Sequence, residues 1–196
     1  SENTTLDPIN LRKKINFLLS KKIKNIILEA SSHGLKQNRL DGLLFDIGIF
    51  TNLSHDHLDY HKNLNDYLKA KLYLFKNLIK RRGKIIVDPT IPQFKLIKKI
   101  ADKKDLKLLT VFESDSDLEL VSHYYENNFQ IVIIKIKNKN QLIKLKLNLI
   151  GKIQIKNVLM AIMAVIRSGL NIKSIEKTIV KLKPAEGRLE KIGNLK

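Results

Sequence analysis

Three histidines and two aspartates fall within seven residues of the segment FTNLSHDHLDYH, which runs from Phe50 to His61. The whole chain has only five histidines. Asp56 and His57 are adjacent and supply a carboxylate oxygen and an imidazole nitrogen, which together suit a divalent cation. The spacing differs from H-E-x-x-H and from the common zinc patterns, so we expect magnesium or manganese. His55 and His61 are more typical of structural or exposed histidines.

Two further residues could join such a site. Glu29 directly follows the apolar run Ile23–Leu28, and an acid at the end of a buried strand can hold magnesium, although an exposed or capping glutamate gives the same pattern. Lys71 lies four residues after Tyr67 and four before Phe75, on the apolar stripe of an expected helix. A lysine there either extends to solvent or reacts with carbon dioxide to give a carbamate, which is an anionic oxygen ligand.

The first half of the chain alternates between apolar runs and amphipathic segments, which must position these residues. We predict strands at 23–28, 44–50, 84–87 and 106–111 and helices at 8–21, 63–79 and 91–103. This alternation favours an α/β fold with an open, mainly parallel, Rossmann-like sheet flanked by helices. Loops at the carboxyl ends of parallel strands meet at one edge, so Glu29 and the histidine segment are expected to lie near each other.

The pattern changes after residue 111. We predict strands at 118–121, 129–137 and 141–149, and the stretch Asn138–Asn140 indicates an antiparallel hairpin between the last two. Helices at 156–167 and 172–182 follow, and Pro184 marks their end. We expect one domain over residues 1–188 and the start of a linker at 189–196.

Composition narrows the range of protein classes. The chain has 196 residues, of which 43% are apolar, and it has no cysteine, which excludes disulfides and thiolate metal sites. No uncharged apolar run is long enough to cross a bilayer, so we expect a cytoplasmic protein. The net charge is +18, but the lysines are dispersed. This pattern favours a basic surface suited to anionic small substrates, and a nucleic-acid-binding module is the alternative.

Six sequence blocks, taken in order, resemble the central domain of the Mur ligases, a P-loop NTPase-like domain. They are NTT (3–5), EASSHGLKQNR (29–39), FTNLSHDHLDYH (50–61), YLKAKLYLF (67–75), GKIQIKNVLMA (151–161) and EGRLE (186–190). More narrowly, they are similar to the branch of the family that adds the third peptide residue of peptidoglycan. The resemblance covers nearly the whole chain.

The resemblance implies ATP-dependent amide-bond formation through an acyl phosphate, with two magnesium sites. The acceptor would be UDP-MurNAc-L-Ala-D-Glu, and the added residue meso-diaminopimelate or L-lysine; no nucleic-acid or membrane partner is expected. Carried onto this sequence, Glu29 and His57 would hold magnesium, and Lys71 as a carbamate would complete the second site. The expected substrate contacts are Thr4, Thr5, Ser31, Gln37 and Arg39, and the expected nucleotide contacts are Asn157 and Arg188.

One motif of the family does not occur in this sequence, the P-loop G-x-x-x-x-G-K-[ST]. We therefore expect a fragment of a three-domain enzyme that does not turn over ATP alone, with an exposed apolar sheet edge that favours aggregation. Ile153 and Gln154 also replace the aromatic–asparagine pair usual after the glycine of GKIQIKN. Two competing interpretations are a folylpolyglutamate or cyanophycin synthetase-like ligase, which would share the fold, and a metal-dependent hydrolase.

Overall fold

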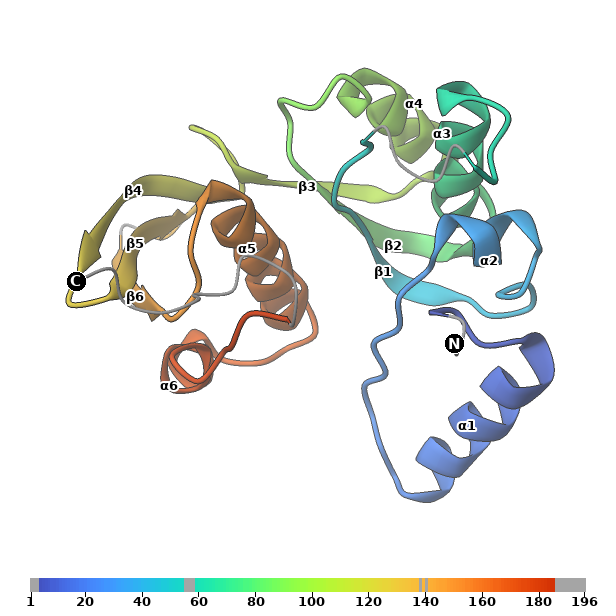
Figure 1. Ribbon diagram of the computed structural model, residues 1–196, viewed down its shortest axis with the longest axis horizontal. Helices are drawn as coiled ribbons and strands as arrows, with labels where there is room; N and C mark the ends of the chain where they lie inside the picture. Colours follow the sequence, from blue (N-terminus) through green and yellow to red (C-terminus); the bar gives the residue numbers. More distant parts are fainter. Residues whose placement is uncertain (1–3, 55–58, 138, 140, 186–196) are drawn as a thin grey trace. The chain divides into compact units, whose positions relative to one another are not determined.

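A computed structural model describes residues 4–54, 59–137, 139 and 141–185 of the chain (Figure 1). Its helices are α1 (Pro8–Ser20), α2 (Ser32–Lys36), α3 (Leu64–Tyr73), the π-helical η1 (Leu74–Leu78), α4 (Phe94–Lys104), α5 (Lys152–Arg167) and α6 (Ile172–Ile179). Its strands are β1 (Phe45–Phe50), β2 (Ile79–Val87), β3 (Lys107–Phe112), β4 (Leu118–Glu126), β5 (Phe129–Ile136) and β6 (Leu142–Leu147). None of the described helices is long and apolar enough to span a bilayer.

The six strands are hydrogen-bonded in sequence order, from β1 to β6. β3 and β4 are parallel, and the β4–β5 and β5–β6 pairs are antiparallel. The predicted hairpin is therefore confirmed, with Gln130 opposite Leu147, and β4 extends the antiparallel region to three strands. A mixed sheet with flanking helices confirms the expected α/β class.

The chain divides into two compact units, and each is described by itself. The first comprises residues 1–48, 52–84 and 96–107, and the second residues 49–51, 85–95 and 108–196. Three helices of the first unit begin at polar caps that the sequence supplies. Asp7 accepts hydrogen bonds from the backbone of Ile9 and Asn10 at the start of α1, Ser31 accepts one from Gly34 in α2, and Asn63 accepts one from Asp66 in α3. These side chains satisfy amide groups that the first turn of a helix leaves without partners.

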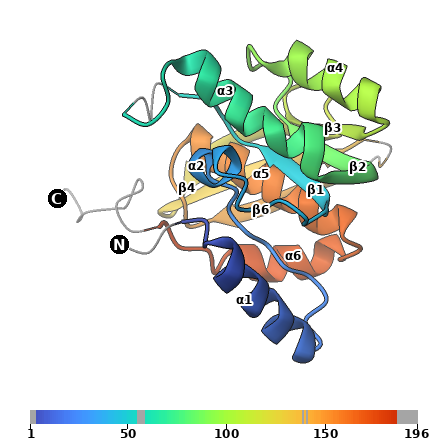
Figure 2. The ribbon, with the colours of Figure 1, turned by 90° about the vertical axis from the view of Figure 1, so that its right-hand side faces the viewer.

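The core of the first unit packs closely around the junction of α3 with the sheet. Figure 2 shows α3 leading into β2, and this passage takes place through the π-helical η1. A Cβ added at Gly48 in β1 would lie 2.8 Å from the Ile79 side chain and 2.9 Å from the Phe75 ring. Glycine therefore permits this approach of β1 to η1 and the start of β2, which fixes the base of the helix that carries Lys71.

The second unit has an antiparallel sheet in which buried and exposed side chains alternate, the largely apolar helix α5 and the amphipathic helix α6. In β6, Ile143, Leu145 and Leu147 are buried and the lysines between them are exposed, as expected of a sheet with one covered face. In α5, the buried side chains include Ile155 and Leu159. Helix α6 contacts β6. Asn157 lies in the second turn of α5, between the buried Ile155 and Leu159.

The strand predicted at residues 23–28 is wrong. Figure 1 shows the stretch between α1 and α2 as an extended coil, but no strand pairs with residues 23–28 within the described part of the chain, and Ile27 is 91% exposed. An apolar run becomes a strand only where a neighbouring strand supplies hydrogen-bond partners, and the sheet order begins at β1 without this segment. Glu29 consequently follows an extended segment rather than a sheet strand.

Candidate functional site

A hydrogen-bond network joins the start of the chain to the loop after Glu29. The Thr5 hydroxyl lies 2.8 Å from the Glu29 backbone oxygen and 2.8 Å from the Ser31 hydroxyl, and it accepts a hydrogen bond from the Ser31 amide at 3.0 Å. A carbonyl can only accept, so the single proton of Thr5 goes to Glu29 and the Ser31 hydroxyl donates to Thr5. The network therefore fixes both the position and the hydroxyl orientation of Ser31.

Arg39 extends this network on its other side. Its Nη1 donates to the Thr5 carbonyl at 2.7 Å, and its Nε donates to the Gln37 side-chain oxygen at 2.8 Å. Gln37 in turn donates to the Tyr60 hydroxyl at 3.0 Å. Four of the five residues expected to contact the substrate, Thr5, Ser31, Gln37 and Arg39, are thus brought together, and the fifth, Thr4, is exposed beside Thr5.

Lys71 lies half-buried on α3, on the apolar side that its spacing predicts. Tyr67 and Phe75 are buried, and the Lys71 ammonium lies 5.3 Å from the centroid of the Tyr67 ring. Burial lowers the pKa of the Lys71 amine, because a charged group loses solvation there, and the nearby Glu29 carboxylate partly opposes this shift. Glu29 and Lys71 therefore lie close enough to interact electrostatically.

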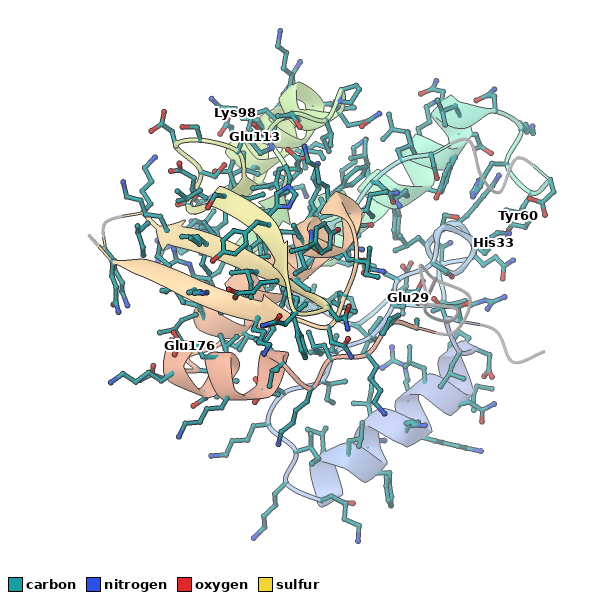
Figure 3. The ribbon with its side chains drawn as sticks, turned by 60° about the vertical axis from the view of Figure 1, so that its left-hand side comes forward. Glu29, His33, Tyr60, Lys98, Glu113 and Glu176 are labelled. Atoms are coloured by element: carbon teal, nitrogen blue, oxygen red, sulfur yellow. The ribbon has the colours of Figure 1, made fainter. Side chains whose placement is uncertain are left out.

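The histidine segment is described only from Asp59 onward, so His55, Asp56 and His57 lie outside the described residues. Among the described residues, no group of three or more histidine, cysteine or acidic side chains forms a metal-binding cluster. Figure 3 shows His33 of α2 beside Tyr60, and their ring centroids are 4.0 Å apart. His61 is buried and lies 2.9 Å from the Ser32 hydroxyl. The histidine segment and the Glu29 loop are therefore in contact, as expected.

In the second unit, Asn157 is exposed on α5, and Arg188 lies outside the described residues. A pair beside Asn157 was not predicted from the sequence: the Lys156 ammonium forms an ion pair with Asp88, which directly follows β2. Asp88 could have been found from the sequence, because it is an acidic residue directly after an apolar strand, the same pattern that pointed to Glu29. No sequence feature indicated Lys156 as its partner.

Comparison with known proteins connects these features to a family. A family model described as the Mur ligase middle domain matches residues 1–165. The UDP-N-acetylmuramoyl-L-alanyl-D-glutamate--2,6-diaminopimelate ligase of Zymomonas mobilis is 36% identical over 188 residues, which are 96% of this chain and 38% of that protein. The ligase of the same name from Fusobacterium nucleatum is 34% identical over 189 residues, which are 96% of this chain and 37% of that protein.

Solved structures of Mur ligases are also similar to this chain. A structure of a UDP-N-acetylmuramoyl-L-alanyl-D-glutamate--2,6-diaminopimelate ligase matches with a TM-score of 0.85 and 27% identity, over 97% of this chain and 39% of that chain. A MurF ligase of Thermotoga maritima in complex with ADP shares the fold, with a TM-score of 0.64 and 14% identity over 82% of this chain and 35% of that one. This chain spans less than half the length of each relative. The match over residues 1–165 shows that the chain belongs to the Mur ligase family and carries its middle domain.

Proposed function

We propose that this chain supplies the substrate-binding and metal-binding middle part of an ATP-dependent ligase that extends UDP-MurNAc-L-Ala-D-Glu by meso-diaminopimelate or L-lysine. The names of the relatives from Zymomonas mobilis and Fusobacterium nucleatum support this proposal. In this reaction, the substrate carboxylate attacks the γ-phosphate of ATP and releases ADP. The amine of the incoming amino acid then displaces phosphate from the acyl phosphate, which leaves an amide. We place the reaction in the cytoplasm.

The environment of Lys71 is the observation that carries the proposal. Burial lowers the pKa of its amine and so raises the fraction of the neutral form, the form that attacks carbon dioxide. The ammonium first loses one proton to give the neutral amine, and the attack of this amine on carbon dioxide forms a carbon–nitrogen bond and releases a second proton, so a cation becomes a carbamate anion. This change replaces a half-buried cation near Glu29 with two oxygen atoms of the kind that bind hard cations.

The donor set fits magnesium once Lys71 is a carbamate. Glu29 and His57 would hold one magnesium ion and the Lys71 carbamate would complete a second site; when bound, the two ions would neutralise the charge of the phosphate groups. Arg39 contributes a guanidinium whose Nε and Nη1 are fixed by Gln37 and the Thr5 carbonyl, so its charge is held at the substrate loop without reorganisation. We assign Thr4, Thr5, Ser31, Gln37 and Arg39 to the UDP-MurNAc-dipeptide and Asn157 and Arg188 to the nucleotide.

Carbamate formation can be measured in the chain itself. In ¹³C-bicarbonate buffer, a ¹³C carbonyl signal of a lysine carbamate is expected, and Lys71→Met should remove it. Lys69→Met is the matched control, because Lys69 is an exposed lysine on the same helix. Calorimetric titration with Mn²⁺ should show binding that requires bicarbonate and is lost in Glu29→Gln. A signal unchanged in Lys71→Met, together with Mn²⁺ binding unchanged in Glu29→Gln, would contradict the proposed site.

The ligase activity is tested in a chimera in which this chain replaces the matching segment of the Zymomonas mobilis relative. We expect phosphate release that depends on UDP-MurNAc-L-Ala-D-Glu, ATP and the amino acid together. Lys71→Met in the chimera should abolish release, and Lys69→Met should preserve it. Phosphate release that is independent of the muramyl dipeptide would favour a hydrolase instead.

A further inference from the structure

His61 bridges two helices of the first unit through both an edge and a face of its ring. Its side chain is 1% exposed, and its Nε2 lies 2.9 Å from the Ser32 hydroxyl of α2. One face of the ring stacks on Tyr67 of α3, with centroids 5.0 Å apart and planes at 20°. The Lys71 ammonium lies 5.3 Å from the centroid of that same Tyr67 ring. A continuous set of contacts therefore runs from Ser32 through His61 and Tyr67 to Lys71.

The second nitrogen of His61 fixes its tautomer. Nδ1 lies 3.6 Å from an Asp66 carboxylate oxygen and has no hydrogen-bond partner within the described residues. Burial, together with the positive charge of Lys36, lowers the pKa of His61 although Asp66 opposes the shift, so the ring is neutral near pH 7. The Asp66 carboxylate favours the single ring proton on Nδ1. Nε2 then accepts a hydrogen bond from Ser32, which fixes this edge of the ring.

Ser32, His61 and Asp66 are also the residue types of a nucleophile, base and acid, but their surroundings argue against nucleophilic catalysis. The Ser32 side chain is 6% exposed, whereas a nucleophile must reach its substrate. The Asp66 carboxylate already forms an ion pair with Lys36 at 2.5 Å and accepts a hydrogen bond from the Lys62 amide at 3.2 Å. Its charge is therefore balanced without a protonated histidine. The arrangement holds elements together rather than activating a hydroxyl.

We infer that His61 is a positioning residue, which anchors the Tyr67 ring to Ser32 and thereby sets where the Lys71 amine lies. The tyrosine ring is the surface on which the Lys71 ammonium rests, through an attraction between the cation and the ring electrons. A Tyr67 ring free to move would weaken this attraction. For the proposed ligase, on which the functional part of this inference rests, His61 acts through Tyr67 on the residue that becomes the carbamate.

Nuclear magnetic resonance tests the inference without any metal, nucleotide or carbamate. A lysine over an aromatic face has its ε-methylene protons displaced upfield by the ring, so Lys71 should differ from the exposed Lys69 on the same helix. His61→Ala should abolish the displacement at Lys71 and leave the Lys69 signal in place. His61→Phe keeps a ring against Tyr67 and should restore it in part. Ser32→Ala keeps the stacking but removes the hydrogen bond, and it should reduce the displacement.

The outcomes separate this inference from the proposed function. An upfield displacement of the Lys71 ε-methylene signal that is unchanged in His61→Ala would overturn the positioning role. Covalent labelling of Ser32 by a fluorophosphonate probe would also overturn it, because labelling would identify a reactive nucleophile. Loss of the displacement in His61→Ala supports the positioning role whether or not the wild-type chain forms a carbamate. Absence of the carbamate from the wild-type chain would contradict the proposed function but not the positioning role. Where the wild-type carbamate forms, His61→Ala should lower its ¹³C signal and His61→Phe should retain more of it.

Discussion

The Lys156 ammonium forms an ion pair with a fully buried carboxylate, that of Asp88 at the carboxyl end of β2. The same carboxylate accepts hydrogen bonds from the Thr90 amide at 2.8 Å and from the Thr90 hydroxyl at 2.7 Å. The Lys156 ammonium also lies 4.6 Å from the centroid of the Phe112 ring. Lys156 immediately precedes Asn157, so this pair holds the turn of α5 that carries the proposed nucleotide contact.

Removing both members of this pair should cost less stability than the sum of the costs of removing each alone. Lys156→Met leaves a buried carboxylate without its cation, and we expect the free energy of unfolding in urea to fall by about 3 kcal/mol. Asp88→Asn should also destabilise the chain, because its amide nitrogen would face the ammonium. The double variant should lose less than the sum of the two. The exposed pair of Lys80 and Asp46 is the matched control, and Lys80→Met should cost less than about 1 kcal/mol. Additive effects at Asp88 and Lys156 would contradict the coupling.

Asp88 should also contribute to acid sensitivity. Burial alone raises the pKa of its carboxyl, but the hydrogen bonds from Lys156 and Thr90 outweigh burial, and the net pKa lies below the ordinary value. A lowered folded-state pKa gives stability that is fully present above the unfolded-state pKa, about 4, and is lost as the pH falls through the folded-state pKa. Urea midpoints measured from pH 7 down to pH 3 should therefore fall more for the wild type than for Asp88→Asn. Parallel curves would show that Asp88 is not the group responsible.

Gly34 should not tolerate a side chain, because Thr5 fills the space where one would lie. A Cβ added at Gly34 would lie 2.8 Å from both Cβ and Cγ2 of Thr5. We expect Gly34→Ala to cost about 1–3 kcal/mol in unfolding free energy and to speed hydrogen exchange of the Ser31 amide, which donates to Thr5. Thr5→Ser removes the Cγ2 methyl, so it should recover part of the loss when combined with Gly34→Ala. No recovery would mean that the methyl group is not the source of the clash.

The features predictable from the sequence are those that depend on residues close together in the chain. The sequence predicted a helix from residue 8, where α1 begins after the cap Asp7, and the stretch Asn138–Asn140 indicated a hairpin. A spacing of four residues placed Lys71 on the stripe of Tyr67 and Phe75. Caps, turns and helical faces are decided within a few residues. The grouping of Thr5, Ser31, Gln37 and Arg39 was instead implied by family resemblance, because neither spacing nor composition brings residue 5 beside residue 31.

Features that depend on distant partners were not predictable. Asp88 and Lys156 are 68 positions apart, and Ser32 and His61 are 29 apart, so no local pattern links them. The strand predicted at 23–28 failed for the same reason. Its composition is that of a buried strand, but a strand also needs a neighbour to receive its backbone hydrogen bonds, and residues 24–28 form none within the described part of the chain.

The extended segment 23–28 should make the chain self-associate. The backbone groups of residues 24–28 have no backbone partner among the residues that the structure describes, and Ile27 beside them is 91% exposed, so the segment forms a template for pairing with another chain. Ile27→Lys should reduce the rise of light scattering with concentration, because a charged side chain would have to be desolvated in the paired state. Ile153→Lys is the matched control, since Ile153 is also an exposed isoleucine, but it lies in helix α5, whose backbone bonds internally. An equal reduction by both variants would assign the effect to added charge, whereas a reduction by Ile27→Lys alone would assign it to the extended segment.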